Sequence, residues 1–320
     1  MIYPPRLKKG DEIRVISPSS SIERIGGMEA NLSSKTYLEK LGFVVTFGKN
    51  ILQSDIQNSS SIQNRIDDLH DAFLDKSVKI VLTTIGGFNS IEMLPYIDFE
   101  LIKNNPKIFC GYSDITALNN SIFSKTGLVT YSGPGYSAFK MKDLQEYQTK
   151  MWLEALQNDS YTLEKSQYYS SDLWFLENIE RKLHTNEWKI YNSGIAEGII
   201  IGANLSTFCL LQGTEYLPKV DNPILFIESS EEDTSFDFTR RLASILLAVP
   251  NLKALLIGRF PKEVNMTEEL FLYILNKHPI LKKIPVMYDM NFGHTQPIFT
   301  FPIGAKANVN TVEKTIKIIK

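Results

Sequence analysis

The first 160 residues alternate short apolar runs with longer segments in which apolar side chains recur every three or four residues. The clearest helical spacing places Ile62, Ile66, Leu69 and Phe73 on one face of a segment at 62–74. The same pattern predicts further helices at 28–41, 115–123 and 143–156, and strands at 13–16, 43–47, 78–84, 107–110 and 128–131. Because helices separate successive strands, the pattern predicts a parallel sheet with helices on both faces.

Small or polar residues follow four of the predicted strands. They are Ser17 to Ser20, Gly86 with Gly87, Ser113, and Gly133 to Gly135. Open parallel sheets bind their ligands at the carboxyl ends of the strands. We therefore expect these four strand ends to lie along one edge of the sheet and to form a site there.

A polar and aromatic stretch without a regular period, residues 158–193, interrupts the alternation. An irregular run of this length inside a folded chain is usually functional or a linker. Regular patterning then returns, with strands predicted at 198–201, 224–227, 254–257 and 286–288, and helices at 205–211 and 236–247. The pattern predicts an N-terminal α/β domain at 1–160, a connector at 161–193 and a smaller C-terminal α/β domain at 194–320.

The composition is that of an ordinary globular protein, since 43% of the 320 residues are hydrophobic and 22% are charged. A formal charge of −2 without a stripe of Lys or Arg argues against a nucleic-acid partner, and no apolar run reaches the roughly 18 residues of a membrane span. Cys110 and Cys209 both lie in apolar runs, which favours buried free thiols over a disulfide. With no apolar signal core after Met1, these features predict a cytoplasmic protein.

The stretch at 108–117 carries the strongest chemical signal. An apolar run ends at Gly111, and Ser113 follows directly before a predicted helix. This arrangement is typical of the nucleophile elbow of serine hydrolases, in which a sharp turn exposes the serine hydroxyl. The second glycine of the usual Gly-x-Ser-x-Gly pattern is replaced by Ile115. Cys110 is a weaker alternative nucleophile, because it lies within the strand rather than at the turn.

A serine nucleophile needs a general base, and the chain has 4 histidines. His294 follows a predicted strand in a turn whose Gly293 leaves the backbone free to aim the ring. His294 is the candidate base. The alternative is that it is a loop histidine held by hydrogen bonds, with no catalytic role. His70 falls on a predicted helix, His184 in the irregular connector and His278 at a helix stop, and none of these contexts favours catalysis.

The third member of a triad is a carboxylate that orients the base and stabilises its charged form. Glu228 ends an apolar strand, where a buried carboxylate normally requires a partner. Glu231, Glu232 and Asp233 have a simpler explanation, because acidic side chains just before a helix stabilise its N-terminus. Glu228 is therefore the candidate acid.

Backbone N–H groups that could bind an oxyanion have two candidate sources. The N–H of Asp114 opens a predicted helix, where N–H groups lack a partner within the helix. The second is the N–H of Gly87, since Gly86 and Gly87 let the backbone approach a ligand closely; a plain strand-to-helix turn is the alternative. No dinucleotide fingerprint or metal-binding motif occurs, so the sequence predicts neither a cofactor nor a metal.

Taken together, these residues resemble the LD-carboxypeptidase and microcin C immunity family of serine peptidases. The matching motifs follow the family's order over most of the chain. They are Leu-Lys-Lys-Gly-Asp at 7–11 with Ile-Ser-Pro-Ser at 16–19, Thr-Ile-Gly-Gly at 84–87, Gly-Tyr-Ser-Asp at 111–114, Gly-Ala-Asn-Leu at 202–205, Phe-Ile-Glu at 226–228 and Gly-His at 293–294. The segment at 202–205 departs from the family's Gly-Gly-Asn-Leu by Ala203, which bears on substrate contacts near Asn204.

The resemblance implies a flavodoxin-like N-terminal domain that carries Ser113 and a smaller C-terminal domain that carries Glu228 and His294. The active site would lie in the cleft between them, with Gly86 and Asn204 near the substrate. The resemblance also implies a homodimeric carboxypeptidase-type hydrolase that uses no metal or cofactor.

Two substrate classes occur in this family. Murein LD-carboxypeptidases release D-alanine from a peptidoglycan tetrapeptide, whereas immunity-type enzymes cut the amide that joins a peptide or amino acid to an aspartyl-nucleotide toxin. Trp174 and Trp188 in the connector resemble the tryptophans with which immunity-type members contact the nucleotide, and an indole face suits stacking on adenine. Packing against a domain surface or a dimer partner is the alternative for both. The immunity branch is the favoured prediction, and the murein enzyme is its rival.

A non-catalytic ligand-binding protein on the same sheet is the alternative from another class. In that case Glu228 and His294 need not approach Ser113. One distance separates the two hypotheses: in an enzyme, Ser113 Oγ should lie about 2.6–3.2 Å from a ring nitrogen of His294.

Overall fold

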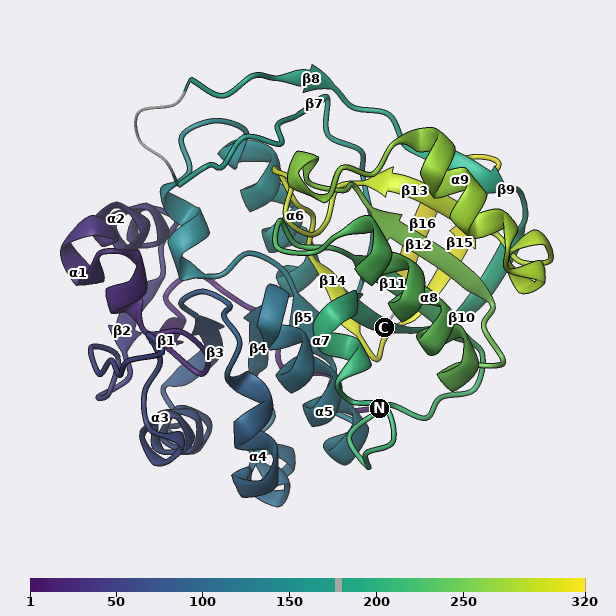
Figure 1. The fold of residues 1–320 in the computed structure, drawn as a ribbon. Helices are drawn as coiled ribbons and strands as arrows, with labels where there is room; N and C mark the ends of the chain where they lie inside the picture. The colour runs from purple at the N-terminus through teal and green to yellow at the C-terminus, as the bar shows by residue number, and fades with distance from the viewer. Residues whose placement is uncertain (176–179, 320) are drawn as a thin grey trace.

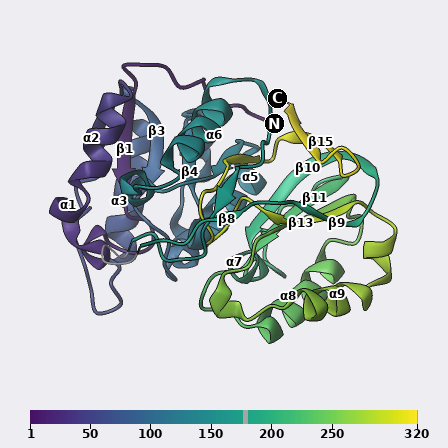
Figure 2. The same cartoon turned by 90° about the horizontal axis from the view of Figure 1, so that it is seen from above.

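Two large β-sheets, one in each half of the chain, organise the fold (Figure 1). The computed structural model describes residues 1–175 and 180–319, so residues 176–179 of the predicted connector and residue 320 lie outside the described part of the chain. The purple-to-blue N-terminal half and the green-to-yellow C-terminal half lie side by side in both views (Figures 1 and 2). The predicted mixed α/β fold with two separate domains is confirmed.

The first sheet has the strand order β14-β5-β4-β3-β1-β2. Its parallel strands are β1 (Glu12–Ile16), β2 (Val44–Phe47), β3 (Val78–Thr83), β4 (Ile108–Gly111) and β5 (Thr130–Ser132). The helices of this half are α1 (Gly27–Ala30), α2 (Leu32–Lys40), α3 (Ile62–Leu74), α4 (Phe99–Asn104), α5 (Thr116–Thr126) and α6 (Gln145–Gln157). Helices α3, α4 and α5 line one face of the sheet, and α2 and α6 lie over the other (Figure 1). The order 2-1-3-4-5 is the predicted flavodoxin-like arrangement.

The helix predicted at 28–41 is broken in two at Asn31. The side-chain amide of Asn31 donates to the carbonyl oxygens of Ile25 (3.1 Å) and Gly27 (2.7 Å). The hydroxyl of Tyr136 donates to the carbonyl oxygen of Asn31 (2.8 Å). These bonds replace helical ones at the break. One of them comes from a residue 105 positions away, which the local spacing cannot reveal.

The second sheet has the order β6-β16-β15-β10-β11-β12-β13-β9. Its central strands are parallel and are those that the pattern predicted: β10 (Ile195–Asn204), β11 (Pro223–Glu228), β12 (Ala254–Gly258) and β13 (Val286–Met290). Strands β15 (Lys306–Asn310) and β16 (Thr315–Ile319) extend it, and its helices are α7 (Leu205–Cys209), α8 (Ser235–Ala248) and α9 (Glu268–Asn276). No helix in the described part of the chain is long and apolar enough to cross a membrane.

The stretch predicted as irregular contains four short strands. They are β6 (Ser160–Thr162), β7 (Tyr168–Tyr169), β8 (His184–Thr185) and β9 (Lys189–Asn192). Strands β6 and β9 form the two edges of the second sheet, while β7 and β8 pair with each other and cross the top of the molecule in Figure 1. Edge strands of two to four residues carry too few side chains for a visible period, so the sequence pattern missed them.

Strand β14 (Phe301–Ile303) belongs to the first sheet although it lies within the predicted C-terminal range. It pairs antiparallel with β5, with Phe301 opposite Ser132. The chain then returns to the second sheet as β15. The two domains are thus joined by strand pairing as well as by the connector.

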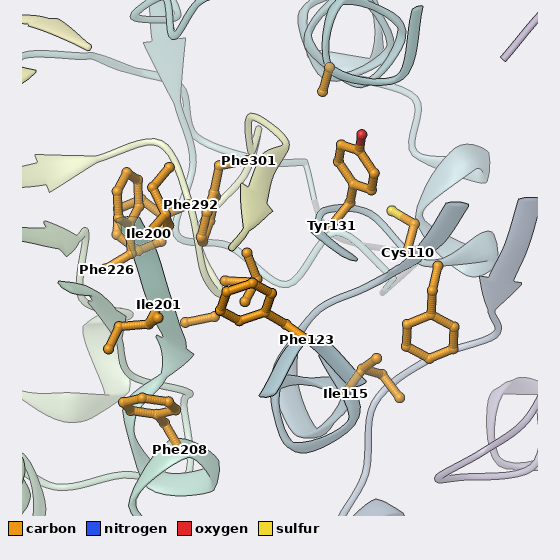
Figure 3. Close-up of a cluster of buried hydrophobic side chains, with 14 of the residues drawn as sticks. Cys110, Ile115, Phe123, Tyr131, Ile200, Ile201, Phe208, Phe226, Phe292 and Phe301 are labelled. Carbon is orange, nitrogen blue, oxygen red and sulfur yellow. The ribbon is translucent and has the colours of Figure 1, made fainter. Parts of the chain in front are cut away.

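Buried apolar side chains fill the space between the two sheets (Figure 3). Phe123 on α5 lies between residues of the first sheet, such as Tyr131, and residues of the second sheet, such as Ile201 (Figure 3). The rings of Phe226 on β11 and Phe301 on β14 stack with centroids 4.4 Å apart. Because this core is continuous across both domains, it holds them in one relative position. Both cysteines are free thiols, and the one in this core, Cys110, is buried.

A buried hydrogen-bonded clasp also joins the domains. Asn120 on α5 donates from Nδ2 to the carbonyl oxygen of Gly202 on β10 (2.8 Å) and accepts at Oδ1 from the Gly202 N–H (3.1 Å). The N–H of Asn204 donates to Thr116 Oγ1 (3.0 Å), and Asn204 lies opposite Glu228 in the pairing of β10 with β11. The clasp therefore links the helix that follows Ser113 to β10, which pairs with the strand that ends at Glu228.

We predict that N120L lowers the free energy of unfolding by roughly 2–4 kcal/mol, because it leaves the buried N–H and C=O of Gly202 without partners. Urea denaturation measures this change. The matched control is S121A, which removes the adjacent buried hydroxyl that has no hydrogen-bond partner, and should change stability by less than about 1 kcal/mol. Equal free energies of unfolding for N120L and S121A would contradict a stabilising role for the hydrogen bonds between Asn120 and Gly202.

Candidate active site

Ser113 sits on a sharp turn between β4 and α5. Its backbone φ is +64°, a left-handed value that non-glycine residues adopt at a cost of about 1–3 kcal/mol. A Cβ on Gly86 would lie 2.7 Å from Ser113 Cβ and 2.8 Å from its Oγ, so only a glycine allows the end of β3 to pass this close. The local geometry is that of a nucleophile elbow.

His294 reaches Ser113 from the other domain. It lies in the loop after β13, and its Nε2 is 3.0 Å from Ser113 Oγ. Gly293 has φ +101°, and a Cβ there would lie 2.7 Å from Glu228 Oε2. The missing side chain at Gly293 therefore lets the loop pack directly against the carboxylate that contacts His294.

Glu228 ends β11 and is 2% exposed. Its Oε2 lies 2.7 Å from His294 Nδ1. When the ring is neutral with its proton on Nδ1, that nitrogen donates to Glu228 and Nε2 is free to accept the Ser113 proton. The Ser113–His294 distance of 3.0 Å falls inside the range expected for an enzyme. The three residues predicted as nucleophile, base and acid are thus brought together in the required order.

The surroundings of His294 favour its charged form. Burial on its own lowers the pKa of the ring, but the charge and hydrogen bond of Glu228, with further charge from Glu231 and Glu232, raise the pKa from 6.5 to about 9. The imidazolium that a general base becomes is therefore strongly stabilised here.

The predicted oxyanion donors lie beside Ser113. A Cβ on Gly86 would be 3.3 Å from the Asp114 nitrogen, so the backbone around Gly86 borders the start of the helix that follows Ser113. Both Gly86 and Gly87 line the cavity that contains Ser113. The roles of the Gly87 and Asp114 N–H groups as oxyanion donors stay predictions.

The side chain of Asp114 has a role that the sequence did not reveal. Its buried carboxylate accepts from Ser19 Oγ (2.5 Å) and from the Ser90 N–H (2.9 Å). Ser19 lies in the loop after β1, and Ser90 begins the 3-10 helix that follows β3, at Ser90–Tyr96. Asp114 thus ties three of the predicted strand ends together around Ser113.

A cavity of about 370 Å³ opens onto Ser113 and His294 and is lined from both domains. Trp174 lines it, as predicted for a substrate contact. The ring of Tyr112 lies 5.4 Å from the ring of His294, between centroids. Several further residues line the cavity without having been predicted as substrate contacts, namely Arg24, Phe88, Tyr112, Lys140, Leu173 and Phe175.

Trp188 and Asn204 do not line this cavity. Trp188 is 1% exposed, donates from Nε1 to Asn291 Oδ1 (2.9 Å) and packs against Phe299. This placement favours the packing alternative for Trp188 over contact with a nucleotide. Asn204 is also buried, and its Oδ1 accepts from the Thr207 N–H (3.0 Å) to cap α7.

The acidic run after Glu228 lies directly before helix α8, as predicted. Helix α8 is capped by Thr234 with Asp237, rather than by the preceding acids. Asp233 instead accepts from Ser206 Oγ (2.7 Å), and Glu231 and Glu232 line the cavity. The capping box of Thr234 with Asp237 satisfies the first turn of α8, and the effect of the preceding acidic charge on this helix stays a prediction.

The other candidate groups have structural surroundings. His70 Nε2 accepts from the Asp98 N–H (3.0 Å), the His184 ring stacks on Tyr169, and the His278 N–H bonds the end of α9. Burial raises the pKa of the Cys110 thiol to about 12, which makes it a poor nucleophile. Among the described residues, no group of three or more His, Cys, Asp or Glu could hold a metal ion.

An elbow serine, a histidine and a buried glutamate at the junction of two α/β domains define the geometry of a serine hydrolase. The chain matches the LD-carboxypeptidase N-terminal domain over residues 13–133 and the LD-carboxypeptidase C-terminal domain over residues 197–309. It belongs to this family of serine peptidases. YocD of Bacillus subtilis is 44% identical to it, over 99% of this chain and 98% of its own.

Solved structures of relatives have the same fold along their whole length. The crystal structure of an MccF-like protein from Bacillus anthracis is 42% identical, with a TM-score of 0.96 and coverage of 100% of both chains. The microcin C7 self-immunity protein MccF in complex with aspartyl sulfamoyl adenosine is 28% identical, with a TM-score of 0.91 over 100% of this chain and 99% of its own. A Bacillus subtilis relative named for murein peptide carboxypeptidase activity is 32% identical, over 98% of this chain and 92% of its own.

We predict that the His294 imidazole titrates with a pKa near 9, and that E228Q lowers this pKa by more than about one unit because the strongest stabilising charge is lost. The chain has only 4 histidines, so NMR titration of labelled imidazoles resolves them. His70, on the opposite domain, is the internal control and should keep its pKa. A His294 pKa that is the same in both proteins would contradict the assigned contact.

Proposed function

We propose that this chain is a serine carboxypeptidase-type hydrolase that uses Ser113, His294 and Glu228 as its triad. The observation that carries this proposal is the continuous hydrogen-bonded chain from Glu228 Oε2 to His294 and on to Ser113 Oγ, with distances of 2.7 and 3.0 Å. A non-catalytic binding protein would have no need for this alignment across two domains. Membership of a serine peptidase family supports the same conclusion.

In the proposed mechanism, His294 Nε2 takes the proton of Ser113 as its Oγ attacks the substrate carbonyl carbon. The Asp114 and Gly87 N–H groups receive the oxyanion, and Glu228 stabilises the imidazolium. His294 then gives its proton to the leaving amine nitrogen as the acyl-enzyme forms. Water then attacks the ester carbon as His294 takes one of its protons. The bond from that carbon to Ser113 Oγ breaks, and His294 returns the proton to Oγ, so the acid is released and both residues regain their starting states.

The proposed substrate is a peptidyl- or aminoacyl-nucleotide conjugate of the microcin C type. The aromatic wall of the cavity supports this choice, since Phe88, Tyr112 and Trp174 offer ring faces on which a base can stack. The MccF relative binds aspartyl sulfamoyl adenosine in its structure. A D-alanine leaving group would leave such a wall unused.

Release of D-alanine from a murein tetrapeptide is the second candidate function. The relative named for murein peptide carboxypeptidase activity supports it. Arg24 also lines the cavity and could pair with the terminal carboxylate of a peptide. The homodimer and the cytoplasmic location remain predictions from the sequence and its resemblance.

We predict that the protein hydrolyses aspartyl sulfamoyl adenosine faster than it hydrolyses a murein tetrapeptide, and that S113A lowers kcat on the better substrate by at least about 10³-fold. Product formation by liquid chromatography and mass spectrometry measures both rates. The matched control is C110A, which removes the buried thiol three residues earlier and should keep turnover within about threefold. Turnover of neither substrate, or a fully active S113A protein, would refute the proposed function; the reverse preference would assign the murein activity instead.

A further inference from the structure

His294 stands in a loop rather than on a helix or strand. This loop, residues 291–297 between β13 and β14, we call the base loop. A general base has to stay within about 0.5 Å of its productive position. The bond to Glu228 holds the imidazole ring, but the backbone of the base loop lacks the regular bonds of a helix or strand. Other contacts of the base loop therefore decide how firmly His294 is aimed at Ser113.

Asn291 ties the two ends of the base loop together. Its side chain is 1% exposed, and its Nδ2 donates to the carbonyl oxygen of Pro297 (3.3 Å). Its own carbonyl oxygen accepts from the Phe299 N–H (2.7 Å). Because His294 lies between these two closures, the position of Asn291 limits the movement of His294.

The connector supplies further partners for the Asn291 side chain. Asn291 Oδ1 accepts from Asn186 Nδ2 (2.6 Å) and from Trp188 Nε1 (2.9 Å), and Asn291 Nδ2 donates to Ser166 Oγ (2.7 Å). An indole N–H only donates, so Asn291 must present its oxygen to Trp188, which leaves its amide nitrogen to face Ser166. All three connector residues are buried, so water does not replace a bond that is lost.

A second connection between the connector and the base loop lies two residues after His294. The Ser170 N–H donates to the carbonyl oxygen of Gln296 (2.8 Å), and the Gln296 N–H donates to the carbonyl oxygen of Ser170 (3.1 Å). The connector thus holds the base loop on both sides of His294, at Asn291 and at Gln296.

The guanidinium of Arg259 fastens the same part of the connector to the second sheet. Arg259 follows β12, and its Nη2 donates to Asn186 Oδ1 (2.8 Å) and to the carbonyl oxygen of Asp289 (2.7 Å). Its guanidinium lies over the ring of Tyr169, 3.7 Å from the centroid. Asp289 lies on β13, the strand that leads into the base loop. The connector is therefore held against the sheet at the point where the base loop leaves it.

We propose that the connector positions the catalytic base, and that Ser166 and Trp188 are positioning residues that act on His294 through Asn291. The inference rests on the proposed role of His294 as general base. Neither positioning residue touches the reacting atoms, and both act by limiting the movement of the base loop. Trp188 thereby has a role in the reaction although it is buried away from the cavity.

Loss of one of these bonds should slow proton transfer and leave substrate binding unchanged. A base displaced by about 1 Å can cost about 100-fold in rate. Proton transfer between Ser113 and His294 determines kcat, so kcat should fall while KM stays constant. A tryptophan that contacts a nucleotide would instead change KM, and a tryptophan that only fills the core would change the free energy of unfolding alone.

Labelling of Ser113 by a small fluorophosphonate measures the activity of the base without a nucleotide ligand. Serine Oγ bonds the phosphorus and fluoride leaves, as the base takes the serine proton. We expect W188F, which keeps the packing against Phe299 and loses only the N–H donor, to react at least about tenfold more slowly than the wild-type protein. S166A should react at least about threefold more slowly, because it removes the Oγ partner of Asn291.

The matched control is W152F, the same substitution at a tryptophan that is 0% exposed and packs on Phe43 and Phe139 in the N-terminal domain. It should react within about twofold of the wild-type rate. Urea denaturation identifies the variants that are folded at the assay temperature. S166A, the smaller change, decides the result if W188F does not fold.

NMR of labelled histidine gives a second readout that needs no reaction. The His294 Nδ1 proton is shared with Glu228, so its exchange with water reports how firmly the ring is held. We expect this exchange to be at least about tenfold faster in W188F and unchanged in W152F.

Wild-type labelling rates in W188F and S166A, or an equal loss in W152F, would overturn the positioning role. A raised KM for aspartyl sulfamoyl adenosine with an unchanged labelling rate would also overturn it, in favour of a nucleotide contact. The proposed hydrolase is judged separately by labelling and turnover of the wild-type protein. An inert wild-type protein in which W188F still speeds proton exchange would overturn the hydrolase alone, whereas an active one with unchanged variants would overturn the positioning role alone.

Discussion

The hydrogen-bonded chain from Glu228 through His294 to Ser113 requires the two domains to be held in a precise relative position. Its two bonds are short, and its members come from different domains. A shift of about 1 Å between the domains would lengthen the bond to Ser113 beyond useful hydrogen-bonding distance. The structure opposes such a shift in three ways: a shared apolar core, the pairing of β14 with β5, and the Asn120–Gly202 clasp.

The hydrogen-bonded triad also explains where the backbone takes unusual conformations or packs unusually closely. Ser113 has a left-handed backbone, and two glycines, Gly86 and Gly293, remove side chains that would otherwise collide with the serine and with Glu228. Asp114 binds the segments that follow β1 and β3 and so fixes the turn that holds the strained serine. Local strain of this kind persists only where surrounding contacts determine it, and here those contacts converge on the proposed nucleophile.

The sequence predicted those parts of the fold that local patterning controls. Helix α3 begins and ends at the predicted residues, and the four central strands of the second sheet lie where apolar runs predicted them. Strand β14 and the edge strands β6 and β9 were missed, because their partners lie far away in the sequence. Asn31 breaks a periodic helix for the same reason, since Tyr136 binds its carbonyl group.

In the candidate site, too, some placements follow from the local sequence and others depend on contacts with distant residues. Ser113 follows a strand of the first sheet, whereas Glu228 ends a strand of the second sheet and His294 lies in a loop after another. Strand ends are where parallel sheets place functional groups, and the chain has only 4 histidines as candidate bases. The placement of Trp188 and of Glu231 could not be predicted, because both depend on tertiary contacts. Trp188 is buried by its bond to Asn291, and the acidic loop faces the cavity because Asp233 binds Ser206 and Arg241.

Labelling with a fluorophosphonate tests whether Ser113 is an activated nucleophile, because the reagent reacts with an activated serine and needs no knowledge of the substrate. Intact-mass measurement and peptide mapping then locate the adduct. We predict one adduct per chain, on Ser113, and a labelling rate at least about 100-fold lower in H294A, where the base is missing. An adduct on another residue, or labelling of H294A at the wild-type rate, would contradict it.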